Sequence, residues 1–169
     1  MPEQIIPSKT GNISLNKMTN EAMELILNAS EKAILAQLPN VSKAAGGEVR
    51  EFVTDSYFMR NGFTKFDGKC GGNNCFDGVY VKGDTVYIVD AKPLSGAGST
   101  SLNPGNASTG LPPQLTDAWV NCATAELKKS ADPAVRKTAD LIVNASKNGN
   151  LVKLVAAADG KGLKVIRVK

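Results

Sequence analysis

The residues with the clearest chemical potential in this sequence are Asp77, Asp90 and Lys92. Asp90 and Lys92 are two positions apart, so in a β-strand both side chains point to the same side. Two carboxylates beside an apolar core repel each other unless a cation lies between them, and carboxylate oxygens are preferred ligands of Mg²⁺ and Mn²⁺. Such a metal polarises a phosphodiester oxygen and lowers the pKa of a bound water, while a nearby lysine stabilises developing negative charge. The three residue types therefore fit metal-assisted hydrolysis of a phosphate ester.

A predicted β-hairpin brings these residues together. The apolar, β-branched segments Phe76–Lys82 and Thr85–Lys92 are separated only by Gly83-Asp84, a spacing typical of a two-residue hairpin turn. Counting outward from this turn, Asp77 faces Asp90, and facing residues of an antiparallel pair project to the same side of a sheet. The hairpin therefore predicts one patch that contains both carboxylates and the lysine.

The same side of the hairpin also carries apolar residues. We expect these to pack against a helix, leaving the charged patch at the end of the hairpin. They are Val79, Val81, Val86 and Ile88.

The absence of histidine excludes several other chemistries. Without histidine the chain has no Ser-His-Asp triad, no histidine-based nuclease site and no His-ligated zinc. The net charge of +4 and the pI near 9.0 are compatible with a polyanionic partner and are also common among proteins that bind none. Any hydrolytic mechanism must therefore use carboxylates, lysine and a hard metal ion.

The remaining pattern predicts an α/β (α+β) domain with one mixed central β-sheet flanked by helices. We expect residues 1–17 to form a flexible N-terminal tail or linker and residues 18–169 to form the domain. No apolar run approaches the ~18–20 residues of a membrane span, and the N-terminal residues contain no apolar signal-peptide core. Besides the hairpin, the expected helices are Thr19–Leu38, Gly46–Arg60, Leu115–Ser130 and Pro133–Asn148, and the expected strands are Phe63–Phe66, Leu151–Ala157 and Leu163–Val168.

Two further features concern loops and cysteines. Residues 93–113 are rich in Gly, Ser, Asn and Pro, and a loop of this length is more often functional than idle, so we expect it to contact substrate or a partner. Cys70 and Cys75 either close a small disulfide across a Gly-Asn loop or are free thiols in a turn. Cys122 lies in an apolar helical pattern that predicts a core position.

The arrangement resembles the PD-(D/E)XK nuclease superfamily. The resemblance rests on Asp77 near the start of one strand and Asp90-Ala91-Lys92 near the end of the next. An acidic helix precedes both strands, and a helix and a strand follow, as in that family. Two positions differ in detail: Phe76 stands where many members have proline, and Asp90 stands where glutamate is also common.

The resemblance implies a metal-dependent endonuclease that is PD-(D/E)XK-like in fold. It implies catalytic roles for Asp77, Asp90, Lys92 and a helical acid, which is Glu48 or, as second choice, Glu51. The implied metal ligands are Asp77, Asp90 and Glu48, and the implied cofactor is Mg²⁺ or Mn²⁺, with Zn²⁺ as an alternative. Gln114, at the expected start of the next helix, is the implied accessory residue.

Within that superfamily, Phe-Asp-Gly-Val-Tyr followed by Ile-Val-Asp-Ala-Lys is similar to the C-terminal nuclease domains of bacterial polymorphic toxins, in particular contact-dependent growth inhibition toxins. This resemblance implies a domain exported as part of a larger protein, which acts in the cytoplasm of a target bacterial cell. It implies DNA or tRNA as substrate and a cognate immunity protein as partner.

Other interpretations of the same residues stay open. Glu48 also suits the first turn of a helix, where the helix dipole favours an acid, and Gln114 also suits an ordinary helix start. Trp119 is expected in the core, with base stacking as the alternative. Two other functions compete with a nuclease: a non-catalytic module that binds nucleic acid or protein, and a hydrolase of another phosphate ester. A basic group on the later helices is either a phosphate-tracking surface or a solvated face: Lys128, Lys129, Arg136 and Lys137.

Overall fold

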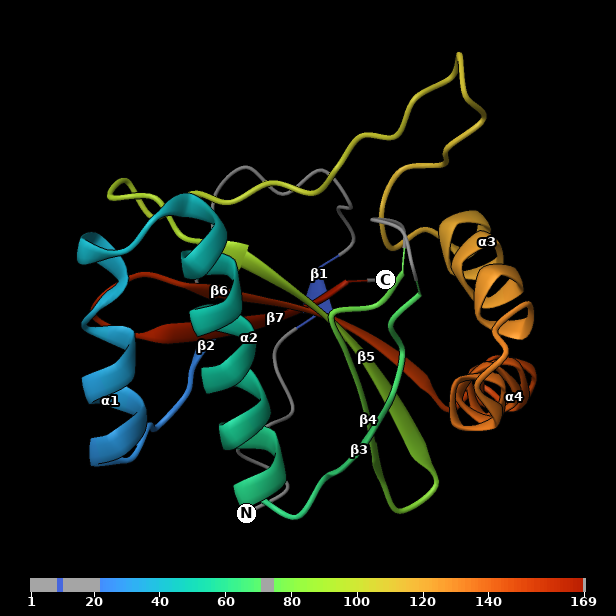
Figure 1. The fold of residues 1–169 in the computed structure, drawn as a ribbon, viewed down its shortest axis with the longest axis horizontal. Coiled ribbons are helices and arrows are strands. Elements are labelled where there is room, and N and C mark those ends of the chain that lie inside the picture. Colours follow the sequence, from blue (N-terminus) through green and yellow to red (C-terminus); the bar gives the residue numbers. More distant parts are fainter. Residues whose placement is uncertain (1–8, 11–21, 71–74, 169) are drawn as a thin grey trace.

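The computed structural model describes residues 9–10, 22–70 and 75–168. Their strands form one seven-stranded mixed sheet with the order β1-β7-β6-β5-β4-β3, and β2 also pairs with β7 (Figure 1). The expected mixed central sheet is therefore confirmed at the level of fold class. The strands are β1 (Lys9–Thr10), β2 (Met23–Glu24), β3 (Thr64–Phe66), β4 (Gly78–Lys82), β5 (Thr85–Pro93), β6 (Leu151–Ala158) and β7 (Leu163–Val168).

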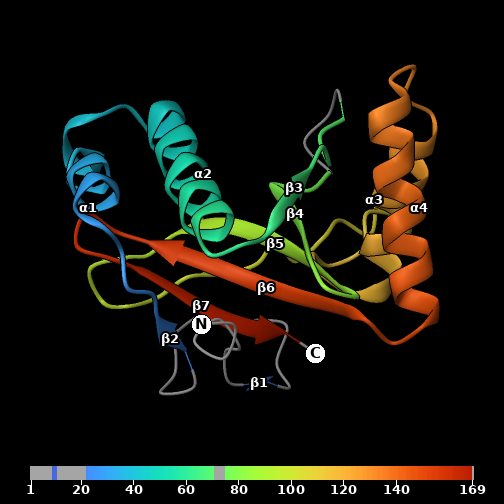
Figure 2. The ribbon, with the colours of Figure 1, turned by 90° about the horizontal axis from the view of Figure 1, so that it is seen from below.

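Helices cover both faces of this sheet. Apolar side chains alternate along β5: Val86 and Ile88 belong to one core cluster, and Val89 belongs to another. The first cluster includes side chains of α3 and α4, and the second includes side chains of α1 and α2, so the two helix pairs lie on opposite faces (Figure 2). The helices are α1 (Ala29–Leu35), the short 3₁₀ helix η2 (Leu38–Asn40), α2 (Lys43–Arg60), α3 (Asp117–Lys128) and α4 (Pro133–Lys147).

The β4–β5 hairpin has the predicted register. Lys82 pairs with Thr85 and, at the other end of β4, Gly78 pairs with Val89. Strand β4 begins two residues later than predicted, so Asp77 lies directly before it. On its other side β5 pairs in parallel with β6, from Val86↔Leu151 to Pro93↔Ala158, which places the end of β5 in the middle of the sheet.

The predicted inner face of the hairpin is also confirmed. Val79, Val86 and Ile88 are buried in the cluster that α3 and α4 cover, and Val81 packs against it. On the opposite face the ring of Tyr80 stacks on Phe58 of α2 at a centroid distance of 4.6 Å. Burial of these side chains on both faces fixes the hairpin in the sheet.

The predicted first helix is wrong over its N-terminal part. Residues 19–21 lie outside the described part of the chain; Met23–Glu24 is strand β2, antiparallel to β7, and α1 begins only at Ala29. Buried Leu25 and Leu27 alternate with exposed neighbours, which is a strand-like period that the helical pattern also accommodates. Asn28 then starts the helix through a capping box with Glu31.

Helix α2 begins earlier than predicted. We expected its start at Gly46-Gly47, but the helix begins at Lys43 because the Ser42 side chain accepts a hydrogen bond from the Ala45 amide. Glycine inside a helix costs about 1 kcal/mol relative to alanine, and here the cap and the packing of the helix outweigh that cost. The predicted end at Arg60, before Asn61-Gly62, is confirmed.

The cysteine predictions have mixed outcomes. Cys70 and Cys75 are joined in a disulfide, one of the two open alternatives. Cys122 is exposed, so its predicted core position is wrong. Buried residues of α3 include Trp119, Val120 and Ala123, and this spacing turns position 122 outward.

Three further predictions concern the core, a loop and the tail. Trp119 is in the core as expected, with its ring edge-on to Phe76. Residues 94–116 form a loop, in which Asn106 and Leu111 form an isolated bridge. Of the predicted tail 1–17, only Lys9–Thr10 is described, and it pairs with β7; the rest lies outside the described residues.

None of the described helices is long and apolar enough to cross a membrane.

We predict that Asn28→Ala lowers the free energy of unfolding by about 1 kcal/mol, because the capping box loses its side-chain acceptor. Urea denaturation monitored by circular dichroism measures this change. Ser30→Ala, at an exposed position of the same helix, is the matched control and should be neutral or slightly stabilising. Equal stability of Asn28→Ala and the wild type would contradict the role of the cap.

Candidate active site at the end of the hairpin

The two strands of the hairpin separate at Asp77. Their last paired positions are Gly78 and Val89, and beyond them the amide of Ala91 donates to Asp77 Oδ2 at 2.9 Å. The Asp77 carboxylate therefore takes the place of a backbone carbonyl as the partner of β5. This bond holds the carboxylate at the point where the strands diverge.

A glycine is required directly after Asp77. The Tyr80 side chain folds back over Gly78, so that a Cβ added to Gly78 would lie 2.7 Å from the Tyr80 hydroxyl oxygen. That hydroxyl donates to Asp55 of α2, which also forms an ion pair with Lys65. The Asp-Gly pair thus allows a buried tyrosine to connect the start of β4 with α2.

Asp90 is a buried carboxylate near the end of β5, with 5% of its surface exposed. Its Oδ1 accepts a hydrogen bond from Gln114 Nε2 at 2.7 Å, and its Oδ2 lies 3.1 Å from Lys92 Nζ. Burial raises the pKa of Asp90 to about 7; the Lys92 ammonium opposes this rise, and the Asp77 charge adds to it. The structure therefore brings together the predicted residues Asp77, Asp90 and Lys92.

Gln114 also lies at this site, although it is not the start of a helix. Helix α3 begins at Asp117 with Thr116 as its cap, and Gln114 belongs to the preceding loop. Its position is fixed by Asn103, whose amide donates to Gln114 Oε1 and whose carbonyl accepts from the Gln114 amide. The long loop thus supplies a side chain that orients the Asp90 carboxylate.

Helix α2 contributes Glu51. Glu51 and Asp77 line one small pocket, together with Thr54 and Tyr80. The ammonium of Lys69 lies 2.6 Å from Glu51 Oε1 and 3.5 Å from Asp77 Oδ1, so the two carboxylates share one cation. Burial lowers the pKa of Lys69, but the neighbouring Glu51 and Asp77 carboxylates outweigh this effect and raise it.

Glu48, our first choice for the helical acid, lies elsewhere. It is exposed on α2, and within the described part of the chain it makes no hydrogen bond or ion pair. The structure thus places Glu51, our second choice for the helical acid, beside Asp77. The assignment of a metal-binding role to Glu48 stays a prediction.

The chemistry of the donor set suits a hard divalent cation. Asp77 and Glu51 already converge on one positive charge, and Asp90 Oδ2 is buried without a hydrogen bond of good geometry. Within the described ranges, however, no three acidic or cysteine side chains lie together closely enough to form a complete ligand group. A metal at this position would therefore rely on two carboxylates and on water, as Mg²⁺ commonly does.

Sequence reasoning missed two cations of this site. Lys69 lies in an irregular loop beside the disulfide, where no periodic pattern indicates the direction of a side chain. Arg50, next to Glu51 on α2, has a buried Nε without a partner among the described residues. Burial lowers the pKa of Arg50, while the charges of Asp77 and then Glu51 oppose this decrease. The only sequence signal for Arg50 is its position beside Glu51 on an amphipathic helix.

Comparisons with known proteins give no relative from which a role could be transferred. No family model matches the chain, and neither the curated proteins nor the solved structures contain a match.

We predict that, without metal, Asp90→Asn becomes increasingly more stable than the wild type as the pH rises from about 4 to about 7. The pKa of Asp90 is raised from 3.8 in the unfolded chain to about 7 in the folded protein, so the folded state keeps a proton that the unfolded state has lost. The stability this proton provides is complete below pH 4 and is lost as the pH reaches 7.

Thermal unfolding in EDTA at pH 4.5, 6.0 and 7.5 measures this difference. Asp84→Asn, at the exposed hairpin turn, is the control for the loss of one carboxylate. A constant difference in melting temperature between Asp90→Asn and the wild type across this pH range would contradict the raised pKa of Asp90.

We also predict that Lys69→Met tightens the binding of Mn²⁺ by about fivefold. The substitution removes the cation that Glu51 and Asp77 share, an interaction of about 1 kcal/mol at a partly exposed position. Isothermal titration calorimetry measures the Kd. Lys65→Met, which removes the ammonium paired with Asp55, is the matched control and should leave the Kd unchanged. Weaker binding by Lys69→Met would show that the lysine supports the metal site instead of competing with it.

Proposed function

We propose that this protein is a metal-dependent endonuclease that hydrolyses phosphodiester bonds. The observation that carries the proposal is the convergence at one end of the β4–β5 hairpin: Asp77 and Asp90 approach each other, Lys92 pairs with Asp90, and Glu51 shares a cation with Asp77. Carboxylates around a cation next to a lysine suit a substrate that carries negative charge and requires an activated water.

Each residue has a distinct part in this proposal. Asp77 and Glu51 would hold the divalent ion, with Asp90 beside them, and the ion would supply Lewis-acid activation of the phosphate and of a water. The Lys92 ammonium, held by Asp90, stabilises the negative charge that develops on the phosphate oxygens. Gln114 fixes the Asp90 carboxylate in the orientation that leaves Oδ2 for Lys92 or a metal.

We further propose that the domain is a toxin that acts on DNA or tRNA in a target bacterial cell and is neutralised by a cognate immunity protein. The similarity of the two strand segments around Asp77 and Lys92 to polymorphic-toxin nucleases supports this part of the proposal. The net charge of +4 is compatible with a polyanionic substrate.

The second candidate function is a non-catalytic module that binds nucleic acid or protein. The burial of Asp90 argues against it, because a buried carboxylate whose pKa is raised by its surroundings costs stability without benefit to a module that only binds. The same burial is useful in a catalytic site, where a group of this kind is poised to change its charge or to bind a cation.

We predict that Asp77→Ala, Asp90→Ala and Lys92→Ala each lower the rate of nucleic-acid cleavage by about 10²-fold or more, because each removes a charge that stabilises the reacting phosphate or its cation. Plasmid DNA and total tRNA, incubated with the protein in Mg²⁺, Mn²⁺ or EDTA and analysed on gels, measure the rate. Chelation should stop cleavage and added metal should restore it.

Asp84→Ala and Lys147→Ala are the matched controls, since both side chains are exposed and lie outside the site. Each variant is checked for folding by circular dichroism. Full activity of a folded Asp77, Asp90 or Lys92 variant would reject the assignment. For the toxin part of the proposal, induced expression of the wild type inside bacteria should arrest growth and Lys92→Ala should not; harmless expression of an active wild type would reject that part alone.

A further inference from the structure

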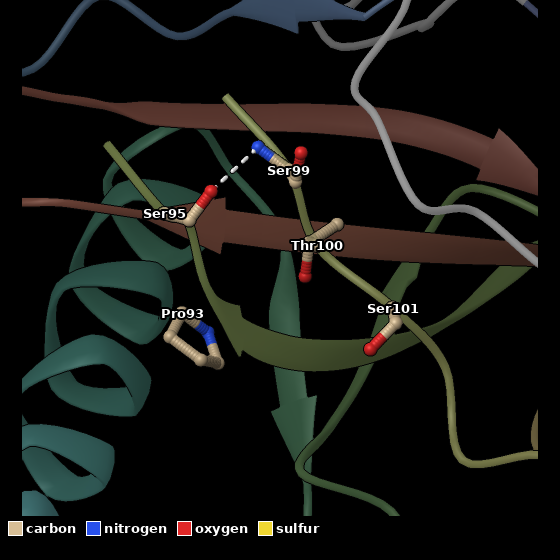
Figure 3. Close-up of a pocket in the computed structure, with 5 residues that line it drawn as sticks. All are labelled: Pro93, Ser95, Ser99, Thr100 and Ser101. Atoms are coloured by element: carbon tan, nitrogen blue, oxygen red, sulfur yellow. Dashed lines mark hydrogen bonds between the residues drawn. The ribbon is translucent and has the colours of Figure 1, made fainter. Parts of the chain in front are cut away.

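A pocket at the end of β5 offers a metal ion no charged ligand among its described residues. It has a volume of about 390 Å³, and Figure 3 shows the residues that line it: Pro93, Ser95, Ser99, Thr100 and Ser101. None of these five carries a charge, and the Ser95 hydroxyl oxygen already accepts a hydrogen bond from the Ser99 amide. Because Mg²⁺ and Mn²⁺ prefer carboxylate oxygens, this pocket does not compete with the candidate active site for such an ion.

The ammonium group of Lys69 lies between two carboxylates of the candidate active site. It is 2.6 Å from Glu51 Oε1 and 3.5 Å from Asp77 Oδ1. A divalent ion that binds both carboxylates must displace this ammonium, because two cations repel each other strongly at such distances. The Lys69 side chain is 53% exposed, so it can move into solvent when it is displaced. Lys69 therefore competes with a metal ion for the same two carboxylates.

A disulfide bond ties this lysine to one of its partner carboxylates. Cys70 directly follows Lys69, and Cys75 lies two residues before Asp77. The bond between the two cysteines therefore links the chain segments that carry Lys69 and Asp77. Such a link raises the effective concentration of the ammonium at the carboxylate, since the two groups cannot separate far. The disulfide thus strengthens the competition with a metal ion.

Without the disulfide, these two segments are held together by noncovalent contacts. The Phe76 amide donates to the Gly68 carbonyl at 3.1 Å, and a Cβ added to Gly68 would lie 2.6 Å from Val79 Cγ2. These contacts hold the backbone before Lys69, whereas the disulfide holds the residue after it. When the disulfide is broken, the chain stays fixed on only one side of Lys69. Its ammonium group then spends less time at the two carboxylates.

The disulfide is open to attack by a reducing thiolate. Cys70 and Cys75 are both partly exposed and pack against the core without being enclosed by it. Exchange requires that the attacking thiolate reaches one of the two sulfur atoms. Disulfides persist in oxidising compartments, whereas the cytosolic thiol systems keep cysteines reduced. A protein that is exported and then enters a cytoplasm passes from the first condition to the second.

We propose that the Cys70–Cys75 disulfide is a redox switch, which holds Lys69 at the metal site and, when it is reduced, allows stronger metal binding. The inference rests on the proposed nuclease function. Two thiols of the reductant give up two electrons and two protons and become a disulfide, while Cys70 and Cys75 become two thiols. The oxidised form outside the target cell then binds metal weakly. The reduced form in the cytoplasm binds metal more strongly and cleaves faster.

The test is calorimetric titration of Mn²⁺ into the full chain, with the disulfide intact and after reduction with dithiothreitol, which is then removed under nitrogen. Reduction should lower the Kd by about threefold, less than the loss of the Lys69 ammonium itself, because Gly68 stays anchored. The Cys70→Ser/Cys75→Ser double variant should bind as tightly as the reduced protein, which excludes metal binding by the new thiols. Lys69→Met should have the same Kd in both states, which a purely structural disulfide would not produce.

Two controls accompany this titration. Cys122→Ser removes the exposed cysteine outside the disulfide and should keep the full response to reduction. Fluorescence of Trp119, the only tryptophan of the chain, reports on the core next to the site, because its ring packs edge-on against Phe76. This fluorescence should be the same in the oxidised and the reduced protein.

The outcomes separate the switch from the nuclease proposal. An equal Kd in the oxidised and reduced protein overturns the switch, and so does a response that persists in Lys69→Met. A reduced protein that loses the Trp119 signal and binds Mn²⁺ more weakly also overturns it, because reduction then destroys the site. Cleavage of plasmid DNA or tRNA tests the nuclease separately. If neither is cleaved with any metal, the nuclease proposal fails, and the calorimetry still decides the switch.

Discussion

The burial of the Asp90 carboxylate is the constraint on which the rest of the site depends. Strand β5 lies between β4 and β6, so a residue near its end is covered from both sides and has little access to water. A charge in such a position is tolerated only if other groups compensate for the lost hydration. Lys92 and Gln114 provide this compensation. Because Gln114 belongs to the loop before α3, the same requirement also orders a segment that has little regular structure of its own.

Positive and negative groups are interleaved around the end of the hairpin. Lys92 lies against Asp90, and Lys69 lies between Glu51 and Asp77. The acidic side chains therefore do not form a cluster of uncompensated negative charge. The positive and negative charges of the site are close to balanced before any ligand binds. A divalent ion that enters this site competes with an ammonium group of the chain. The affinity for metal therefore depends on Lys69 and Lys92 as well as on the carboxylates.

The sequence predicted those parts of the site that depend on local periodicity. The two-residue turn fixed the hairpin register, and the alternation of side chains along the strands placed Asp90 and Lys92 on one side. The predicted start of the last helix at Pro133 is the observed start of α4, where Asp132 is the cap. Each of these signals depends on residues that are close together in the sequence, so it can be read from one sequence without knowledge of the tertiary contacts.

Other features of the fold and the site depend on contacts between residues that are far apart in the sequence, and local patterns do not predict them. The segment before Asn28 fits a helix or a strand equally well, and its pairing with β7, far along the chain, determines the outcome. Lys69 belongs to a loop without periodicity, so only its contact with Glu51 and Asp77 reveals a role. The choice between Glu48 and Glu51 likewise depends on how α2 is rotated against the sheet, and packing sets that rotation.

The parallel pairing of β5 with β6 has a consequence for the order of folding. The β4–β5 hairpin closes across two residues and can form within microseconds, whereas residues 86–93 must find residues 151–158 across both later helices. The hairpin that carries Asp77, Asp90 and Lys92 therefore precedes the strand that buries it. During synthesis a ribosome-bound chain that ends before Leu151 has these three residues but lacks β6, so the site is completed only after residues 151–158 have emerged.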